Sequence, residues 1–363
     1  MSASRVPLDL TRGSVALTAA LCDIESVSGN ETPLTDAIMD ALGHATHLEL
    51  LRDGDTIVAR TSLGRTQRVI IAGHLDTVPI NGNVPSTFQT DSLGVEWLWG
   101  RGTVDMKAGV AVQLTLAVEL VSPAYDITWI WYDHEEVDAA ANGLGRLARN
   151  HPELFAADFA ILGEPSNSTV EGGCNGTIRV DVRAHGVRAH SARAWVGENA
   201  IHKLAPALAA LNAYEPRQVE VEGLVFREGL NAVGISGGVA TNVIPDAVTL
   251  HVNYRFAPSR SADEAIAHVR EIFPDFDVEV VDRSEGARPG LNAPIALDFV
   301  NAVGAQPKPK YGWTDVARFS AMGIPAINFG PGDPSLAHAD DERVAVAQIV
   351  ECERALRTWL SGG

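Results

Sequence analysis

The sequence predicts an α/β protein with two domains, in which a smaller α+β domain is inserted into a larger α/β domain. The chain has 363 residues, which is long for one hydrophobic core and short for three. Short apolar runs alternate with helical patterns towards both ends of the chain, as in α/β domains. The middle of the chain instead follows the order β-α-β-β-α-β, which is the ferredoxin-like arrangement.

The larger domain is predicted from four apolar runs that are too short for core helices and therefore indicate buried strands. These runs are residues 69–72, 127–132, 159–162 and 324–329. Helical patterns cover residues 35–42 and 107–121, and Ser14 is expected to cap an earlier helix. We expect this domain to comprise residues 1–176 and 289–363.

The inserted domain is predicted over residues 177–288. Its first strand, 177–185, alternates apolar and polar residues, as expected when one face of a sheet is exposed. The patterns that follow are a helix, two strands, a helix and a strand, at roughly 199–214, 233–235, 248–256, 261–273 and 278–280. Ser261 is the expected N-cap of the second helix.

The overall charge argues against a nucleic-acid-binding protein. The chain has 46 acidic and 28 basic residues, a formal net charge of −18, and would repel a phosphate backbone. Its three cysteines are far apart, which argues against a disulfide framework and favours a reducing, cytoplasmic location. Residues 1–24 lack the apolar run of a signal peptide. The sequence contains no apolar stretch of 18 residues, so no membrane span is predicted.

Histidines and carboxylates follow the predicted strands of the larger domain at the points where these strands end. In open α/β sheets, ligands bind in the crevice beyond the carboxyl ends of the strands. A further segment, residues 100–107, opens a helix and carries Asp105. We therefore expect six side chains to converge in this crevice: His74, Asp105, Glu135, Glu136, Glu164 and His338.

This set of side chains suits a metal site. Taken singly, a histidine beside an aspartate is more often a local hydrogen bond, and a Glu-Glu pair is more often a solvated surface. The repeated placement at strand ends favours a shared site instead. Imidazole nitrogens and carboxylate oxygens are ligands that zinc accepts, and two divalent ions would relieve the repulsion between crowded carboxylates.

Seven segments resemble the M20 family of metallopeptidases and deacylases, in family order and across nearly the whole chain. They are GHLDTVP (73–79), GRGTVDMKAG (100–109), DHEE (133–136), GEPS (163–166), RAHSAR (188–193), TNVIPD (241–246) and LAHADDE (336–342). Four longer segments are similar to the actinobacterial branch of succinyl-diaminopimelate desuccinylases: NGLGR (142–146), REGLNAV (227–233), NYRFAPSRS (253–261) and YGWTDVARF (311–319). One departure is His134, which stands where the family usually has Asp.

The resemblance implies a metal-binding role for five residues. His74 and Glu164 would hold one zinc ion, and Glu136 and His338 would hold a second. Asp105 would bridge the two ions, and the peptide bond after it would be cis. The implied cofactor is thus two Zn²⁺ per chain, for which Co²⁺ can substitute.

The resemblance also assigns catalytic roles. Asp76 would accept the ring N–H of His74, and Glu135 would be the general base. His190, in the inserted domain, would stabilise the oxyanion in the active site of a partner subunit, so a homodimer is implied. On physical grounds alone, an exposed loop histidine is the simpler interpretation of His190.

Four residues are candidates for substrate binding. Arg255 lies 13 residues after Asn242, a spacing that resembles the carboxylate-binding pair of the family. Arg318 follows Thr314 shortly before the last predicted core strand and could reach the crevice. Arginine grips a carboxylate through two parallel hydrogen bonds, although a surface ion pair is the plainer explanation of each arginine.

The resemblance implies a small-molecule N-acyl amino acid as substrate. The expected reaction removes the succinyl group from N-succinyl-LL-2,6-diaminopimelate, giving LL-diaminopimelate and succinate. An acetylornithine deacetylase, an aminoacylase or a dipeptidase of the same fold is the first alternative. The second is a metal-binding scaffold without catalysis, which would not need a base such as Glu135 beside its ligands.

Overall fold

The computed structural model describes residues 7–362, and their contacts divide the chain into two compact units. The first unit runs to Gly172 and also contains Gly290–Lys308 and the chain from Arg318 onwards. The second unit contains Gly173–Pro289 and Pro309–Ala317. Residues 1–6 and 363 of the predicted larger domain lie outside the described residues.

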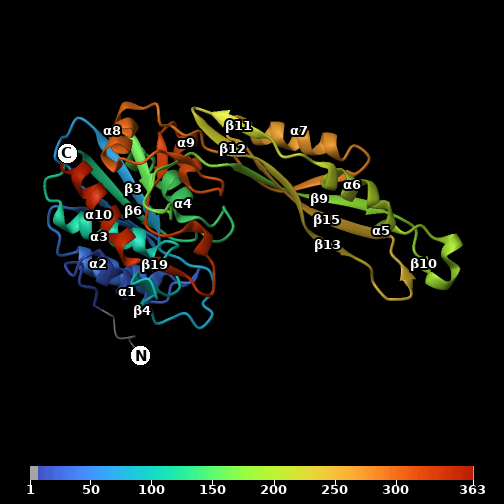
Figure 1. Cartoon of the computed structure of the whole chain (residues 1–363), viewed down its shortest axis with the longest axis horizontal. Helices are drawn as coiled ribbons and strands as arrows, with labels where there is room; N and C mark the ends of the chain where they lie inside the picture. The colour runs from blue at the N-terminus through green and yellow to red at the C-terminus, as the bar shows by residue number, and fades with distance from the viewer. Residues whose placement is uncertain (1–6, 363) are drawn as a thin grey trace. The chain divides into compact units, whose positions relative to one another are not determined.

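The first unit is built on an eight-stranded sheet, of which β3 and β6 are labelled among the helices in Figure 1. Its strand order is β1 (Glu49–Asp53), β2 (Thr56–Arg60), β6 (Asp126–Tyr132), β3 (Arg68–His74), β7 (Phe159–Leu162), β18 (Ala326–Asn328), β8 (Glu171–Gly172) and β17 (Lys308–Pro309). The four strands β6, β3, β7 and β18 run parallel, whereas β1 and β2 form an antiparallel hairpin at one edge.

The four apolar runs of the sequence are confirmed as these parallel strands. Every residue of β6 and β7 is buried, as is all of β3 except Arg68. Strands that are covered on both faces carry continuous apolar sequence, which is why periodicity of two is absent here. The last strand is shorter than expected, because only Ala326–Asn328 of residues 324–329 pair with a neighbour.

Helices flank this sheet. They are α1 (Ser14–Cys22), α2 (Thr32–Leu42), α3 (Lys107–Glu119), α4 (Gly143–Asn150), α8 (Pro294–Val303), α9 (Val316–Ala321) and α10 (Val346–Leu360), with short 3₁₀ turns η1 (Pro152–Phe155) and η3 (Pro334–Leu336). Helix α3 packs on β3 and β6, and α1 and α10 pack beside it. The predicted cap at Ser14 is wrong: Gly13 is the N-cap, and the Ser14 hydroxyl donates to Glu353 over 2.6 Å.

The first unit also contains a small second sheet, which the sequence did not predict. It positions the segments on either side of the predicted metal-binding residues Asp105 and His338. It contains β4 (Thr87–Thr90), β5 (Glu96–Trp99) and β19 (Arg343–Ala345), in the order β19-β5-β4. Beyond β5, the Gly100 amide donates to the Glu342 carbonyl over 3.0 Å. The segment that leads to Asp105 therefore lies beside the segment that follows His338.

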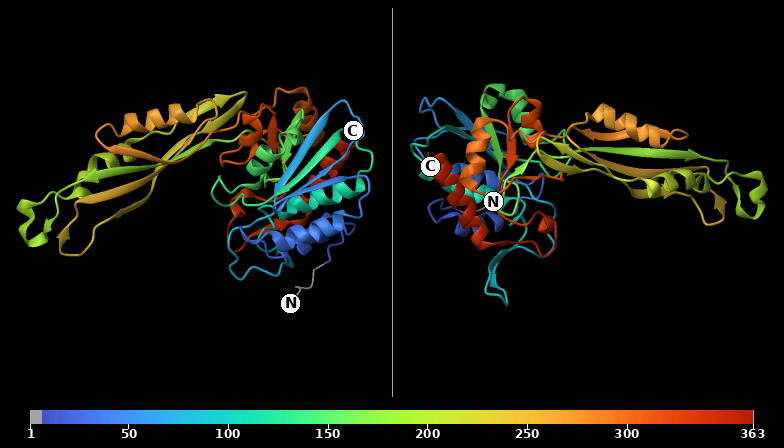
Figure 2. Two further views of the ribbon diagram at one scale, coloured as in Figure 1. Left: turned by 180° about the vertical axis from the view of Figure 1, so that it is seen from behind. Right: turned by 45° about the horizontal axis from the view of Figure 1, so that its top comes forward.

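The second unit contains an antiparallel four-stranded sheet in the order β13 (Gly229–Gly237), β15 (Ala247–Phe256), β9 (Gly176–His185) and β16 (Asp277–Ser284). Helices α5 (Ala200–Lys203), α6 (Ala205–Ala213) and α7 (Ala262–Ile272) complete the ferredoxin-like order that the sequence predicts. Figure 2 shows the helices of this unit against its long strands. The core is formed where alternate residues of β9 and β15 meet these helices.

The predicted helix at 199–214 is divided in two at Leu204, where Pro206 opens the first turn of α6. Ser261 caps α7 as predicted and forms a capping box with Glu264. Two antiparallel strand pairs were not expected: the hairpin of β11 (Gln218–Val221) and β12 (Leu224–Arg227), which precedes β13, and the pairing of β10 (Ala189–His190) with the distant β14 (Val243–Ile244). Among residues 7–362, no helix is both long and apolar enough to cross a membrane.

Candidate metal centre

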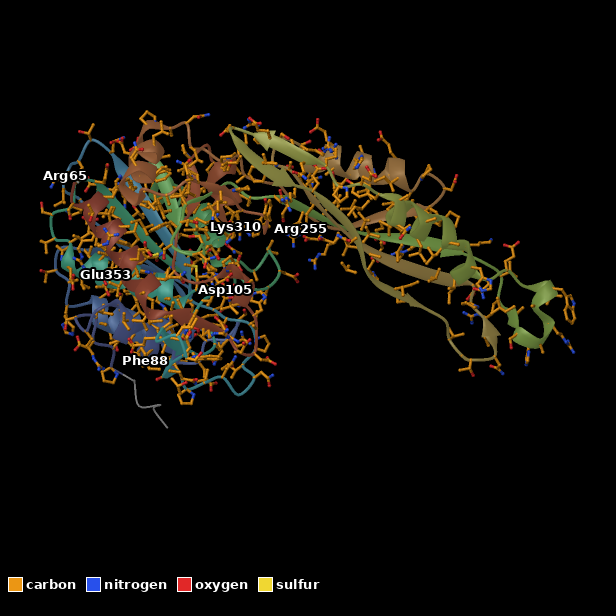
Figure 3. The ribbon with its side chains drawn as sticks, in the orientation of Figure 1. Arg65, Phe88, Asp105, Arg255, Lys310 and Glu353 are labelled. Atoms are coloured by element: carbon orange, nitrogen blue, oxygen red, sulfur yellow. The ribbon has the colours of Figure 1, made fainter. Side chains whose placement is uncertain are left out.

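The predicted ligands lie on one strand end and four loops of the first unit. His74 is the last residue of β3, and Asp105 lies just before α3, where Figure 3 labels it. Glu136 follows β6, and Glu164 follows β7. His338 comes two residues after η3 and has a positive φ of 65°. The parallel strands thus bring together residues from distant parts of the sequence.

Asp105 lies between the two histidines. Its Oδ1 is 3.0 Å from His74 Nε2, and its Oδ2 is 3.3 Å from His338 Nε2. On the outer sides, Glu164 Oε1 is 3.9 Å from His74 Nε2, and Glu136 Oε1 is 3.0 Å from His338 Nε2. One ligand atom from each of His74, Asp105 and Glu136 lies within 4.8 Å of the others. The carboxylate of Asp105 therefore faces two imidazoles with two separate oxygens.

The electrostatics of the site favour cations. Burial alone would lower the pKa of His74, but the hydrogen bonds and charges of Asp105 and Asp76 together outweigh it and hold that pKa well above its usual value. Hydrogen bonds with Asp105 and Glu136 raise the pKa of His338 to about 10. The same carboxylates that stabilise protonated imidazoles attract divalent cations. Two imidazoles and three carboxylates are a donor set that fits zinc.

Asp76 connects the first imidazole to the loop after β6. The Nδ1 atom of His74 lies 2.9 Å from the backbone carbonyl of Asp76 and 3.5 Å from its carboxylate, so the shorter contact is with the carbonyl. The carboxylate of Asp76 instead accepts the backbone N–H groups of Glu135 and Glu136, each over 3.0 Å, and the Ser28 hydroxyl. Asp76 therefore orients His74 through its main chain and the two glutamates through its side chain.

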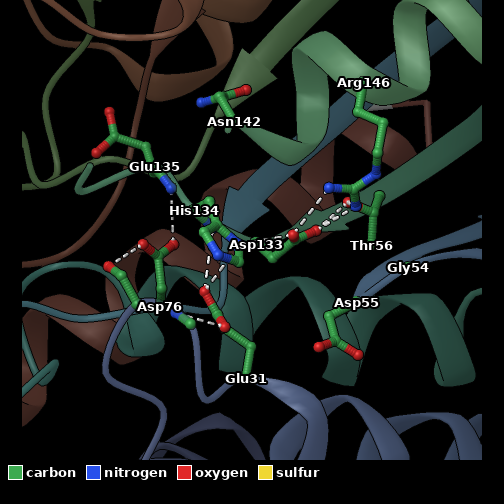
Figure 4. A network of polar contacts seen from close by, with 12 residues as sticks. Glu31, Gly54, Asp55, Thr56, Asp76, Asp133, His134, Glu135, Asn142 and Arg146 are labelled. Carbon is green, nitrogen blue, oxygen red and sulfur yellow. Dashed lines mark hydrogen bonds and ion pairs between the residues drawn. The ribbon is translucent and has the colours of Figure 1, made fainter. Parts of the chain in front are cut away.

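The predicted general base, Glu135, lies in this loop after β6. Figure 4 shows the Glu135 carboxylate turned away from Asp76, while the Glu135 amide points towards it. The predicted cis peptide is confirmed between Asp105 and Met106. The chemical roles of Glu135 and of the five ligands remain predictions.

The centre is supported by a buried ion pair that the interpretation of the sequence overlooked. Arg101 Nη1 lies 2.7 Å from Glu342 Oε2, and both side chains are almost fully buried. Glu342 Oε1 accepts the backbone N–H groups of Val104 and Asp105. The two charged residues lie in the GRGTVDMKAG and LAHADDE segments, so charged residues beside ligand motifs were the available signal.

The second unit carries four of the other candidates, and it brings two of them together. His190 is exposed and is paired with Val243, and the Ser191 amide donates to the Asn242 carbonyl over 2.9 Å. The Ala192 amide donates to His190 Nδ1 over 3.0 Å. In the neutral ring this leaves the proton on Nε2, which makes that atom a hydrogen-bond donor.

The two other candidates in this unit lie near Cys174. Arg255, labelled in Figure 3, is half-buried on β15, and burial lowers its pKa. Its Nε donates to Asn253 over 3.2 Å, and it has no ion pair within the described residues. Thr314 is buried, and its carbonyl accepts from the Cys174 thiol. Thr314 belongs to the second unit, although the sequence predicts it in the larger domain.

Arg318 belongs to the first unit and lies on α9. Its Nη2 donates to the Ala139 carbonyl over 3.4 Å, in the loop that leads from Glu136 to α4. A Cβ added at Gly145 would come within 2.9 Å of Arg318 Nη1, so the guanidinium lies against the start of α4. A role in substrate binding stays a prediction for Arg318.

Comparison with known proteins identifies the family. The sequence profile of peptidase family M20/M25/M40 matches residues 70–361. The succinyl-diaminopimelate desuccinylase of Corynebacterium glutamicum is 46% identical over 365 residues, covering 98% of each chain. A Mycobacterium tuberculosis protein that is provisionally given the same name is 51% identical over 358 residues, which are 98% of this chain and all of that one.

Solved structures agree with the fold. A tripeptidase from Staphylococcus aureus superposes with a TM-score of 0.75 at 21% identity, over 98% of this chain and 99% of that chain. The YXEP protein of Bacillus subtilis, described as a dinuclear metal-binding peptidase of the M20 family, superposes with a TM-score of 0.69 at 14% identity, over 95% of each chain. The chain therefore belongs to peptidase family M20/M25/M40, a family of metal-dependent hydrolases.

Proposed function

We propose that this protein is a di-zinc amide hydrolase that converts N-succinyl-LL-2,6-diaminopimelate and water to LL-diaminopimelate and succinate. The observation that carries the proposal is the position of Asp105 between His74 and His338, with Glu136 and Glu164 on the outer sides. Identity of about half the residues over the full length of desuccinylases in two actinobacteria supports the substrate.

The five ligands divide into two sets that share Asp105. His74 and Glu164 would hold one zinc ion, and His338 and Glu136 would hold the other. Lewis-acid activation of the amide carbonyl and of water is the chemistry that these ions supply when bound. A metal in each set would also compensate the negative charge of the three carboxylates. Without metal, only protonated histidines compensate that charge.

Glu135 would act as the general base and then as the general acid. It takes a proton from the attacking water and returns it to the nitrogen of the leaving amine, so that the amide C–N bond breaks and succinate is released. The Asp76 carboxylate holds the backbone of Glu135 during both transfers. His190 would donate from Nε2 to the oxyanion of a partner subunit's substrate, since Nδ1 already accepts from Ala192.

Arg255 is the best-supported candidate for binding a substrate carboxylate. The substrate carries three carboxylates, whereas the protein has a net charge of −18, so attraction must come from local donors. A half-buried guanidinium without an ion pair among the described residues is such a donor. The free, buried Cys22, Cys174 and Cys352 agree with the cytoplasmic location expected for a biosynthetic enzyme.

The test is a reconstitution assay. The purified protein is stripped with a chelator and titrated with zinc, and the release of succinate from N-succinyl-LL-2,6-diaminopimelate is measured at each step. Activity should be absent from the stripped protein and should reach its maximum at two zinc ions per chain. Binding of two zinc ions without any release of succinate would contradict the proposed activity, and saturation at one ion would contradict the di-zinc site.

A further inference from the structure

The loop that carries Glu135 and Glu136 begins at a buried carboxylate, Asp133. Asp133 directly follows β6 and is 2% exposed. Its Oδ1 accepts the Thr56 hydroxyl over 2.6 Å, and its Oδ2 lies 2.8 Å from His134 Nδ1. Burial alone would raise the pKa of Asp133, but hydrogen bonds from Arg146 and Thr56 outweigh it, so the pKa lies below its usual value.

Arg146, on α4, grips this carboxylate with both terminal nitrogens. Nη2 lies 2.6 Å from Asp133 Oδ1, and Nη1 lies 3.0 Å from Asp133 Oδ2. The same guanidinium donates from Nη2 to the Asp53 carbonyl over 2.8 Å and from Nε to the Asp53 carboxylate over 3.2 Å. Figure 4 shows the fork of Arg146 directed at Asp133 and Thr56. Arg146 thus ties the β1–β2 hairpin to the first residue of the loop.

The backbone makes room for this contact at two glycines. The Gly143 amide donates to the Asp133 carbonyl over 2.8 Å, and a Cβ at Gly143 would lie 2.4 Å from Asp133 Oδ1. Gly54 has a φ of 63°, and a Cβ there would lie 2.8 Å from Arg146 Nη2. A larger residue at either position would push the guanidinium or the carboxylate out of place.

Beyond Asp133 the loop is held by its own amides. His134 adopts a positive φ of 57°, and its N–H donates to the buried carboxylate of Glu31 over 3.2 Å. The next two N–H groups, of Glu135 and Glu136, donate to Asp76. His134, with its left-handed backbone, therefore lies between two fixed points of the loop. Asp133 before it is held by Arg146, and the two amides after it are held by the Asp76 carboxylate.

We propose that Arg146 is a positioning residue that, through Asp133, aims Glu135 and Glu136 at the metal centre. The inference rests on the proposed function, because it assumes that Glu135 transfers the proton and that Glu136 holds a metal. Without the guanidinium, Asp133 would lose two of its donors and the loop would lose its fixed starting point. Catalytic groups need to be held to within about 0.5 Å, so this loss would affect both glutamates at once.

The test compares Arg146→Lys and Arg146→Met with Arg149→Met. Arg149 is exposed on the same helix and makes no ion pair within the described residues, so it controls for the loss of one positive charge from α4. For each variant we would measure kcat and KM at saturating zinc, zinc affinity by competition with a chromophoric chelator, and thermal unfolding. The first two measurements are made well below the unfolding transition.

We expect both Arg146 variants to lose about tenfold or more in kcat with KM nearly unchanged, and zinc affinity at one site to fall by about tenfold. Arg146→Lys should lose as much activity as Arg146→Met, because lysine cannot form two parallel hydrogen bonds with Asp133. Arg149→Met should match the wild type. If the Arg146 variants equal Arg149→Met in kcat and zinc affinity and differ only in unfolding temperature, Arg146 stabilises the fold alone and the proposal is wrong.

Two provisions keep the outcome decisive. Should Arg146→Met not fold, Asp133→Asn removes the charge that Arg146 binds while keeping the shape of the side chain, and the same losses are expected. Should the wild type not hydrolyse the succinylated substrate, the proposed function fails, yet the zinc measurement still decides this inference. Weaker zinc binding in Arg146→Lys but not in Arg149→Met supports it, and equal binding overturns it.

Discussion

Glu135 and Glu136 are neighbours in the sequence with different surroundings. Glu136 lies 3.0 Å from the imidazole of His338 and within reach of Asp105 and His74, as a ligand would. The Glu135 side chain points away from Asp76, which holds only its amide. Two adjacent carboxylates can therefore serve different purposes, one in holding metal and one in moving a proton.

This difference predicts opposite effects of two conservative substitutions. Glu135→Gln should keep both zinc ions and lose about 10²–10⁴-fold in kcat, because only proton transfer is removed. Glu136→Gln should instead weaken one zinc site, with activity partly restored at high zinc. Zinc content by metal analysis and kcat at several zinc concentrations separate the two. Loss of zinc in Glu135→Gln with full zinc in Glu136→Gln would mean that the roles are reversed.

The sequence was informative about which residues meet, and less so about their hydrogen bonds. His74, Glu136, Glu164 and His338 could be predicted to converge because they lie at or after the ends of parallel strands, which share one edge of the sheet, and Asp105 because its segment opens the helix α3. The contact of His74 with the Asp76 carbonyl, by contrast, depends on a side-chain torsion and on the path of one loop. No periodicity or spacing encodes such a choice.

At the scale of the element, the second unit contains a buried carboxylate that joins several strands. Glu228, between β12 and β13, is 5% exposed and accepts from Arg217 through both oxygens, at 2.8 and 2.9 Å. The Tyr254 hydroxyl on β15 donates to it over 2.8 Å, and the Ala257 amide over 3.2 Å. The β11–β12 hairpin is thereby attached to the central strand β15.

This cluster predicts a pH-dependent stability. Burial alone would raise the pKa of Glu228, but hydrogen bonds from Arg217 and Tyr254 outweigh it and hold the pKa below the usual 4.5. The unfolded chain therefore binds the proton more readily, and the stabilisation is present above pH 4.5 and lost as pH falls through the lower folded pKa. Glu228→Gln should cost about 1.5–3 kcal/mol of unfolding free energy at pH 7.

Urea unfolding at several pH values between 7 and 3 checks this expectation. The difference between the wild type and Glu228→Gln should shrink as the pH falls, because the wild type loses the same interaction on protonation. Glu215→Gln is the matched control, since Glu215 is exposed and has no partner within residues 7–362. A difference that stays constant from pH 7 to pH 3 would contradict the assignment.

The elements of the second unit could be predicted because polarity alternates along its long strands. Along β15, from Val248 to Phe256, every second side chain is buried, and β9 follows the same pattern. The hairpin of β11 and β12 was not predicted, although burial alternates along β12, and each of its strands has only four residues. The break at Leu204 could be anticipated only from Pro206, which also fits the first turn of a new helix.

At the scale of the whole molecule, the edge of the second unit's sheet suggests a second copy of the chain. Strand β13 ends the sheet and pairs only with β15 among the described strands. Val233 and Ile235 on it are 65% and 54% exposed. Long edge strands with exposed apolar residues tend to pair with another chain. The homodimer remains a prediction, and the exposed edge of β13 is the surface that it would use.

A mixing experiment tests whether His190 acts across that dimer. Glu135→Gln chains lack the base and His190→Ala chains lack the oxyanion donor, so each homodimer should be almost inactive. Mixed dimers contain one site with an intact base and a donor from the other chain, and they should recover partial activity. Differently tagged chains prove subunit exchange. No recovery after proven exchange would show that His190 does not act in the partner's site.

The central claim is that this family member selects a succinylated substrate, and the most direct measurement is a comparison of kcat/KM. The zinc-loaded enzyme is assayed with N-succinyl-LL-2,6-diaminopimelate, N-acetylornithine and a dipeptide under the same conditions. We predict that kcat/KM for the succinylated substrate exceeds the others by about 10²-fold or more, because an acyl group without a carboxylate would leave Arg255, the proposed carboxylate donor, unpaired. Equal values for N-acetylornithine and the succinylated substrate would contradict the claim and leave only a metal-dependent deacylase of broad specificity.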